Sequence, residues 1–137
     1  MADTSFVCQS GAYQDALDAM TRYANATMHL FIQGFSPTPT SSLASFQANE
    51  ATFDGYTAAT LAEWSEPILA GSAWAIEAPT QIFRWVFASG VGNMIQGYWL
   101  QDSAGNLIDY TVFDPAESVA SFGQAVQRTP VEVFPWG

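Results

Sequence analysis

The stretch that decides the fold is residues 93–113, NMIQGYWLQDSAGNLIDYTVF. Two runs of aromatic and branched aliphatic residues flank the short polar segment 102–106, DSAGN. Two such runs joined by a short connection that contains glycine are typical of a β-hairpin. Asp102 can accept hydrogen bonds from backbone amides of the turn, and Gly105 tolerates a positive φ. The stretch therefore predicts two antiparallel strands at the centre of a β-rich domain.

Shorter strand patterns lie on both sides of this hairpin. Residues 27–33, TMHLFIQ, alternate two largely apolar sets, so we expect a strand that is covered on both faces. Turns are expected at 54–55, 89–92 and 114–117, and further strands at 56–64, 68–69, 73–77, 81–88, 118–122, 125–127 and 129–136. Seven or eight strands at this short spacing predict a mainly β fold, either an antiparallel β-sandwich or a jelly-roll-like barrel.

One helix is expected near the N-terminus. Tyr13, Leu17 and Met20 recur at helical spacing, and Ser10 is a suitable N-cap, so the helix is predicted over residues 11–25. We divide the chain into an N-terminal arm, residues 1–9, and a single β-rich domain, residues 10–137, that ends in a proline-containing tail. The length of 137 residues suits one domain with a real core.

The segment 34–45, GFSPTPTSSLAS, is predicted to be a loop because of its prolines, serines and threonines. A loop of this length in a compact domain often contacts a partner. Residues 46–53 are expected to form a short helical turn or an irregular segment.

The composition is poor in charge and strongly acidic. Charged residues make up 12%, against roughly 25% in a typical soluble domain. The net charge is −10, with three arginines and no lysine, which argues against binding to nucleic acid or to anionic membranes. Either another protein covers part of the uncharged surface, in a homo-oligomer or a larger assembly, or Ser, Thr, Gln and Asn fill that surface.

Signals for export and for membrane insertion are not recognisable. No basic residue precedes an apolar run at the N-terminus, and no apolar stretch reaches the roughly 18 residues of a membrane span. We therefore expect a protein that is made in the cytoplasm and is not secreted by a signal peptide. Cys8 is the only cysteine, so it forms no intrachain disulfide, and no neighbouring residue in the sequence would activate it.

Catalytic and metal-binding patterns are weak. His29 is the only histidine and lies in an apolar strand, so we interpret it as a core or interface residue with one hydrogen bond. One histidine and one cysteine cannot form a zinc site, and segment 102–106 lacks the later ligands of a calcium loop. Acidic residues are abundant and include Asp109, Glu63, Glu66 and Glu77. Their spacing, however, identifies no pair of carboxyls that could act in a glycosidase. We predict no catalytic, metal-binding or cofactor-binding residue, and no cofactor.

Several short phrases occur together in this sequence. They are MHLF at 28–31 after the helix, FDGY at 53–56, WSEP at 64–67, IQGYWLQD at 95–102 and GNLI at 105–108. In this order they resemble small structural proteins of tailed bacteriophages. There a short helix and an L-x-L-F/Y strand precede an F-x-G-Y-x-x-x-x-L segment and a G-Y-Y/W-x-x-D-x-x-G-x-L hairpin. The resemblance spans about residues 11–113, and the tail VEVFPWG departs from the plain strand with which that pattern often ends.

The resemblance implies a virion component, with a capsid decoration (cement) protein as the favoured function and the major capsid protein or another virion protein as partner. It would be non-enzymatic and homo-oligomeric, with a trimer as one candidate. The expected protein contacts are Tyr13, Leu17, Met20, Phe35, Pro37, Pro39, Leu43, Val131, Val133, Phe134 and Trp136. Two alternatives remain open: a carbohydrate-binding module or fibre component with exposed Trp74, Trp85 or Trp99, and a small hydrolase that uses Asp109.

Overall fold

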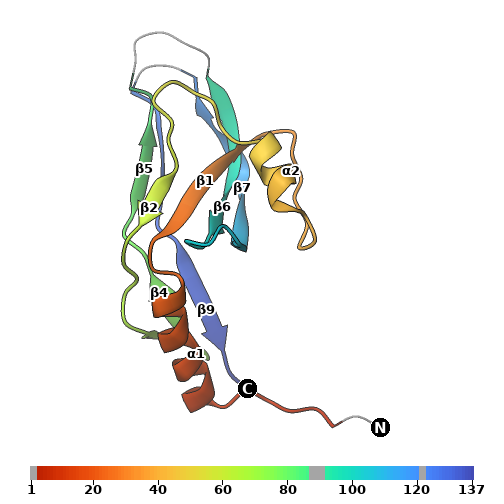
Figure 1. Ribbon diagram of the computed structural model, residues 1–137, viewed down its shortest axis with the longest axis vertical. Helices are drawn as coiled ribbons and strands as arrows, with labels where there is room; N and C mark the ends of the chain where they lie inside the picture. The colour runs from red at the N-terminus through yellow and green to blue at the C-terminus, as the bar shows by residue number, and fades with distance from the viewer. Residues whose placement is uncertain (1–2, 87–91, 121–122) are drawn as a thin grey trace.

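A computed structural model describes residues 3–86, 92–120 and 123–137 of the chain (Figure 1). The described part contains two helices, α1 (Gln9–Arg22) and α2 (Leu43–Ala48). Its nine strands are β1 (Ala26–Ile32), β2 (Ala59–Leu61), β3 (Ile68–Ala70), β4 (Ala73–Glu77), β5 (Gln81–Arg84), β6 (Asn93–Gln101), β7 (Leu107–Val119), β8 (Ala125–Arg128) and β9 (Val131–Pro135). They form antiparallel sheets in the orders β2-β1-β6-β7, β3-β4-β9 and β5-β8.

The predicted mainly β fold is confirmed, and its sheets are arranged like a sandwich. The described residues form no closed barrel, and their nine strands exceed the predicted seven or eight. The strands predicted at 68–69 and 73–77 are β3 and β4, which pair with each other around a turn at Gly71, where φ is 62°.

The predicted hairpin is β6 and β7. Asp102 N–H donates to the Asn106 carbonyl at 2.8 Å, and Asp102 Oδ1 accepts from the backbone N–H groups of Ala104 and Asn106. Gly105 has a φ of 89°, as the turn requires. The predicted role of this segment as turn chemistry is therefore confirmed.

Strand β1 lies beside β6 and is covered on both faces, as predicted. Met28 and Leu30 point into the main core together with their partners Leu100 and Tyr98. On the other face Phe31 forms a smaller cluster with Phe46 of α2 and Trp99 of β6, whose side chains are fully buried.

The predicted turn at 114–117 is wrong, because β7 continues through it to Val119. After a shift of register between Ile95 and Gly97, Glu117 pairs with Ile95 and Val119 pairs with Asn93. Pro115 lies within the shifted segment, where the ladder requires no N–H from it.

Helix α1 differs from its predicted bounds. It begins at Gln9 and ends at Arg22, because the Ala12 N–H donates to the Cys8 carbonyl and Cys8, rather than Ser10, is the N-cap. The arm therefore ends at Cys8. The buried residues of the helix are alanines, Ala12, Ala16 and Ala19, and the predicted face of Tyr13, Leu17 and Met20 borders them.

Several other predicted segments also shift. Helix α2 starts three residues before the predicted helical turn because the Ser42 hydroxyl caps it by accepting the Ser45 N–H at 3.2 Å. The strand predicted over 56–64 is reduced to β2, and the strand predicted over 81–88 begins with β5. Residues 87–88 of that prediction, the turn at 89–91 and residues 121–122 lie outside the described residues.

One end of the molecule is built from α1 and the sheet β3-β4-β9. Figure 1 shows α1 beside β4 and β9 at this end, where the C-terminus also lies. The Gly137 N–H donates to the Val7 carbonyl at 2.9 Å, so the arm and the tail are joined there. We call this part of the molecule the terminal end.

Candidate functional site

The predicted contact residues fall into two groups. The first group lies at the terminal end, because α1 packs on β4 and β9; its members are Tyr13, Leu17, Met20, Val131, Val133, Phe134 and Trp136. The second group lies on another part of the molecule, in the loop before α2 and in α2 itself; its members are Phe35, Pro37, Pro39 and Leu43. The structure therefore does not unite all the predicted contacts in one surface.

Within the terminal end, the face of the sheet β3-β4-β9 that packs against α1 carries aromatic side chains. The Tyr13 ring lies 4.9 Å from the Trp74 ring in an edge-on arrangement, and the Trp74 ring lies 6.2 Å from the Trp136 ring. A hollow of about 490 Å³ there is lined by Gln9, Ser10, Tyr13 and Trp74. The Trp74 Nε1 atom is buried and has no hydrogen-bond partner among the described residues.

The opposite side of the same sheet is apolar and open. Directly paired residues of an antiparallel sheet point to the same face, so Ile68, Ala75 and Val133 share a face that excludes Trp74 and Phe134. Because Trp74 faces α1, Ile68 and Val133 face away from it, and they are 49% and 55% exposed. Val131 on the same face is 46% exposed. We call this surface the outer sheet face.

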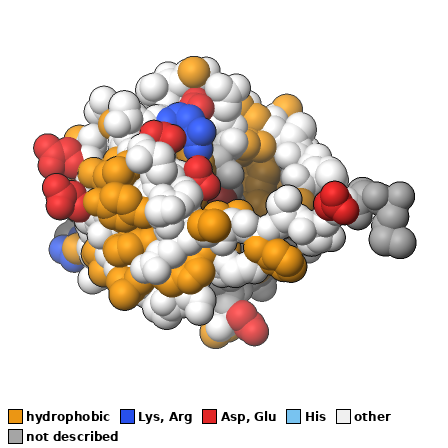
Figure 2. All heavy atoms as spheres, turned by 90° about the horizontal axis from the view of Figure 1, so that it is seen from below, with side chains coloured by type: hydrophobic (Ala, Val, Ile, Leu, Met, Phe, Trp, Pro, Cys, Tyr) orange, Lys and Arg blue, Asp and Glu red, His pale blue; other side chains and the backbone are white. Residues whose placement is uncertain are grey.

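Figure 2 views the molecule from the terminal end and shows hydrophobic side chains gathered over it, with a few carboxylates and arginine side chains around them. The arm adds Phe6, which is 73% exposed. Exposed apolar surface that gathers in one region is typical of a protein contact, whereas scattered single residues require no explanation.

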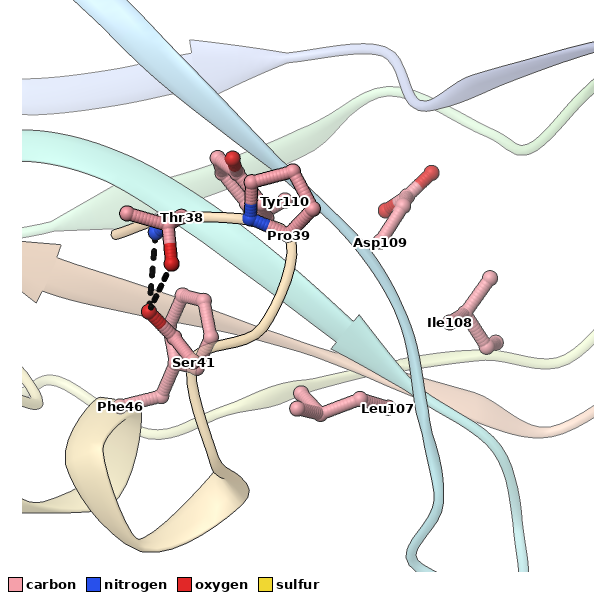
Figure 3. Close-up of a pocket in the computed structure, with 8 residues that line it drawn as sticks. All are labelled: Thr38, Pro39, Ser41, Phe46, Leu107, Ile108, Asp109 and Tyr110. Carbon is pink, nitrogen blue, oxygen red and sulfur yellow. Dashed lines mark hydrogen bonds between the residues drawn. The ribbon is translucent and has the colours of Figure 1, made fainter.

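The second group of predicted contacts mainly covers the core. Phe35 and Leu43 pack on the buried cluster of Phe31, Phe46 and Trp99. A hollow of about 350 Å³ separates the loop before α2 from β7 (Figure 3). It is lined by Thr38, Pro39 and Ser41 on the loop side and by Leu107 and Tyr110 on the strand side. Ser41 Oγ accepts the Thr38 N–H at 2.8 Å and holds the loop in its turn. Pro39 is exposed and is the predicted residue of this loop most accessible to a partner.

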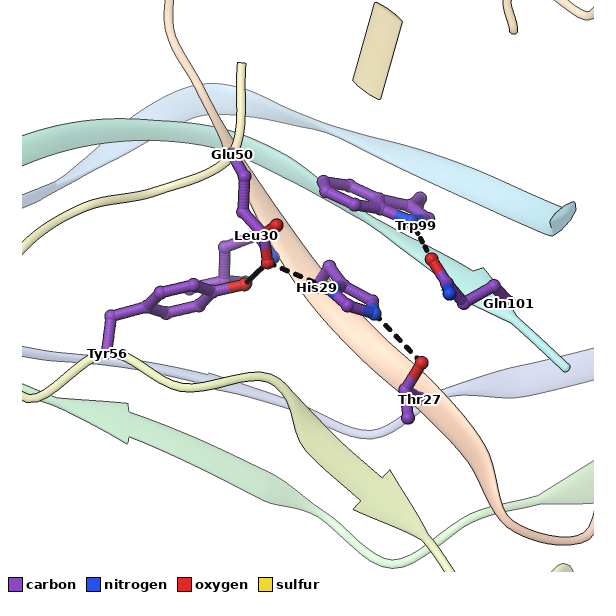
Figure 4. A network of polar contacts seen from close by, with 7 residues as sticks. All are labelled: Thr27, His29, Leu30, Glu50, Tyr56, Trp99 and Gln101. Carbon is purple, nitrogen blue, oxygen red and sulfur yellow. Dashed lines mark hydrogen bonds and ion pairs between the residues drawn. The ribbon is translucent and has the colours of Figure 1, made fainter. Parts of the chain in front are cut away.

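His29 belongs to a polar network that sequence analysis did not predict (Figure 4). Its Nδ1 lies 2.7 Å from Glu50 Oε2, its Nε2 lies 2.8 Å from the Thr27 hydroxyl, and its ring stacks on Trp99. Since a carboxylate can only accept, Nδ1 must carry the hydrogen. His29 thus makes two side-chain hydrogen bonds in place of the single one expected.

Tyr56 completes this network. Its hydroxyl donates to Glu50 Oε2 at 2.5 Å and accepts the Leu30 N–H at 3.1 Å. Burial and the Glu50 carboxylate raise the pKa of the Tyr56 phenol far above its ordinary value. Burial of Glu50 acts to raise its own pKa, but the hydrogen bonds from His29 and Tyr56 outweigh that effect and the pKa of Glu50 is lowered.

The order hydroxyl, imidazole, carboxylate also occurs in nucleophilic hydrolases. Such enzymes require in addition a substrate hollow and donors for the oxyanion. Neither of the two hollows described above is lined by Thr27 or His29. What the network does in this structure is to connect β1 with the chain that follows α2 and with Tyr56.

We predict that Glu50→Gln destabilises the fold by about 1 to 2 kcal/mol at pH 7, because a neutral amide replaces a carboxylate that accepts two hydrogen bonds. A carboxyl whose pKa is lowered on folding contributes stability above its ordinary value of 4.5, and that contribution is lost as the pH falls. The destabilisation caused by Glu50→Gln should therefore be smaller at pH 4 than at pH 7. Urea denaturation at pH 7 and pH 4, with the exposed Glu63→Gln as control, measures this; an equal loss at both values would contradict the account.

A second polar pair joins two sheets. Asp109 of β7 and Glu132 of β9 have carboxyl groups that hydrogen-bond to each other, with Tyr98, Thr111 and Arg128 nearby. Asp109 Oδ1 and Glu132 Oε1 are buried and receive no N–H or O–H from the described residues. Because neither of these oxygens has a donor and the two carboxyls lie together, protonation of one of them is favoured. Burial raises the pKa of Asp109, and burial together with the adjacent Asp109 raises the pKa of Glu132 to about 9.

Two of the three tryptophans named for sugar binding do not fit that role. Trp85 and Trp99 are 2% and 0% exposed, because both pack inside the sandwich. Trp74 is half-buried and remains accessible at the hollow beside Tyr13. Within the described ranges, no cluster of three or more His, Cys, Asp or Glu side chains could hold a metal ion. No helix among the described residues is long and apolar enough to cross a membrane.

The fold defines the class of this chain as a mainly β, sandwich-like protein with an N-terminal helix. Comparison with known proteins found no matching family model, no matching curated protein and no matching solved structure.

Proposed function

We propose that this chain is a non-enzymatic structural protein that attaches to a larger protein assembly through its terminal end. The observation that carries the proposal is the gathering of exposed apolar side chains on α1, β3, β9 and the arm. Stable protein contacts are built from a buried apolar centre with a polar rim, and the terminal end offers both. It also includes seven of the eleven residues expected to make contacts.

Within this class, we propose a capsid decoration protein of a tailed bacteriophage. The phrases at 28–31, 53–56, 64–67 and 95–108 support this choice. A decoration protein needs flat surface to bury against a shell and needs no reactive site. Its partner would be the major capsid protein, it would be located in the virion, and it would assemble there as a homo-oligomer. An acidic outer surface would keep the particles dispersed.

The proposal is tested by sedimenting the purified chain with empty shells of the major capsid protein encoded in the same genome. We expect saturable binding, with a fixed number of copies per capsid subunit, because decoration sites repeat with the lattice. Bovine serum albumin serves as the control for trapping. Chain that remains in the supernatant at every concentration would contradict the proposal.

Carbohydrate binding is a second candidate function, favoured by one observation. The hollow at Tyr13 and Trp74 combines aromatic rings with the amide of Gln9 and the hydroxyl of Ser10, a combination that suits a sugar ring. Quenching of tryptophan fluorescence by a sugar, together with absence of shell binding, would favour this candidate over attachment to a capsid.

A further inference from the structure

We propose that the outer sheet face is the part of the terminal end that meets the partner, and that the partner presents an apolar patch bordered by arginine or lysine side chains. This inference rests on the proposed function and adds to it both the contact face and the chemistry of the partner. Three features of the sheet β3-β4-β9 support it: its apolar centre, its acidic border and its lack of cations.

The centre of the outer sheet face is apolar across all three strands. Ile68 pairs with Ala75, which pairs in turn with Val133, so one row of side chains crosses the sheet. The next row consists of Ala70, Ala73 and Pro135. The alanines of β4 are nearly buried between larger neighbours, which makes a shallow, flat floor with Ile68 and Val133 at its sides. Such a floor can accept a flat apolar surface.

The border of this face carries negative charge. Glu77 pairs with Val131, so it points to the same face, and it is exposed. Glu66 is also exposed and precedes Ile68 by two residues. Opposite charges at the rim of a contact steer the encounter and fix its orientation.

Cations of the chain itself lie elsewhere. The chain has three, and β3, β4 and β9 contain none of them. Arg128 forms an ion pair with Glu117 at 2.6 Å, Arg22 lies over the Tyr23 ring at the end of α1, and Arg84 is on β5. The carboxylates of Glu66 and Glu77 are therefore left for a partner to neutralise.

A second copy of the chain fits this face poorly. It would bring the same carboxylates and a further net charge of −10, and it has no arginine on this face to offset them. Like charges placed together in a contact oppose association. Charge complementarity thus selects a different protein, with a basic border, as the occupant.

Val133→Asp tests the centre of the face in the shell-binding experiment. A carboxylate in an apolar contact loses its hydration without a partner, so the affinity should fall about 100-fold or more. Val112→Asp is the matched control, since Val112 is also a strand valine, is 50% exposed and lies on β7, outside the terminal end. It should bind as the unchanged protein does. Urea denaturation verifies that both variants are folded.

The double variant Glu66→Gln and Glu77→Gln tests the border. It should bind more slowly at low salt and show a weaker salt dependence than the unchanged chain, while Asp114→Asn, an exposed carboxylate of β7, should leave both unchanged. If the Val133→Asp variant binds the shells as tightly as the Val112→Asp variant, the inference is overturned and the proposed function is left intact. If the unchanged chain is a dimer and the Val133→Asp variant is a monomer, the occupant of the face is a second copy of the chain. This result would also overturn the inference. No binding by the unchanged chain would remove the proposed function itself.

Discussion

Gly97→Ala is expected to destabilise the chain by about 3 kcal/mol or more, a large part of the stability of an ordinary domain. Gly97 lies in the middle of β6, where a Cβ atom would be 2.0 Å from the Thr111 carbonyl oxygen and 2.4 Å from Phe31 Cζ. The first of these atoms belongs to the backbone of β7 and cannot move without breaking the ladder. The yield of soluble protein and its urea midpoint measure the effect.

Gly11→Ala is the matched control for this substitution. In α1 the new Cβ would meet only Val7 Cγ1 at 3.9 Å, an ordinary contact. Alanine is the better helix former, so this variant should gain about 0.5 to 1 kcal/mol. If Gly97→Ala were as stable as Gly11→Ala, the Phe31 ring could not lie over β6 as described.

Glu132→Gln is expected to stabilise the chain at alkaline pH by about 2 kcal/mol while changing its stability little near pH 5. Glutamine stays neutral, and its amide can donate to the Asp109 carboxylate, which replaces the proton of the native pair. The native pair loses this proton as the pH rises and then places two negative charges between β7 and β9.

The direction of the pH dependence follows from the sign of the shift. The pKa of Glu132 is raised on folding from its ordinary value of 4.5 to about 9. The folded state therefore holds a proton that the unfolded state has released, and the contribution to stability is full below pH 4.5 and is lost as the pH rises towards 9. Because Glu132 is only partly buried, solvent screens its charge, and we expect a loss of about 2 to 3 kcal/mol between pH 6 and pH 9.

Free energies of unfolding at pH 5, 7 and 9 test this expectation. In Glu132→Gln the decline towards pH 9 should flatten, whereas the exposed Glu63→Gln should follow the unchanged chain. A decline of equal slope in Glu132→Gln would show that the carboxyl pair does not hold a proton in the folded state.

Local patterns were sufficient to predict the hairpin and the strand next to it. The alternation in β1 and the DSAGN turn depend on residues that are neighbours in the sequence, and short-range rules apply to them. The ends of α1 were less predictable because a backbone hydrogen bond to Cys8, rather than a side-chain cap at Ser10, begins the helix. The extension of β7 through Pro115 depends on pairing with β6, and a single strand carries no signal for it.

The polar pairs could not be predicted from the sequence. His29 meets Glu50, and Asp109 meets Glu132, only after segments far apart in the chain have packed together. The predicted contact residues included Val131 and Val133 but not Ile68, because the register that places Ile68 beside them through Ala75 is a property of the assembled sheet. The three tryptophans also differ in burial: Trp85 and Trp99 are buried, whereas Trp74 is not. No local pattern in the sequence predicts this difference.

The most direct test of the central claim is the sedimentation of the unchanged chain with shells of the major capsid protein encoded in the same genome. Attachment through the terminal end predicts saturation at a fixed ratio to the capsid subunits. If the outer sheet face makes the contact, Val133→Asp should also weaken the binding about 100-fold or more while Val112→Asp preserves it. The claim would be contradicted if the unchanged chain did not bind, or if binding survived Val133→Asp and further carboxylates at Tyr13 and Trp136.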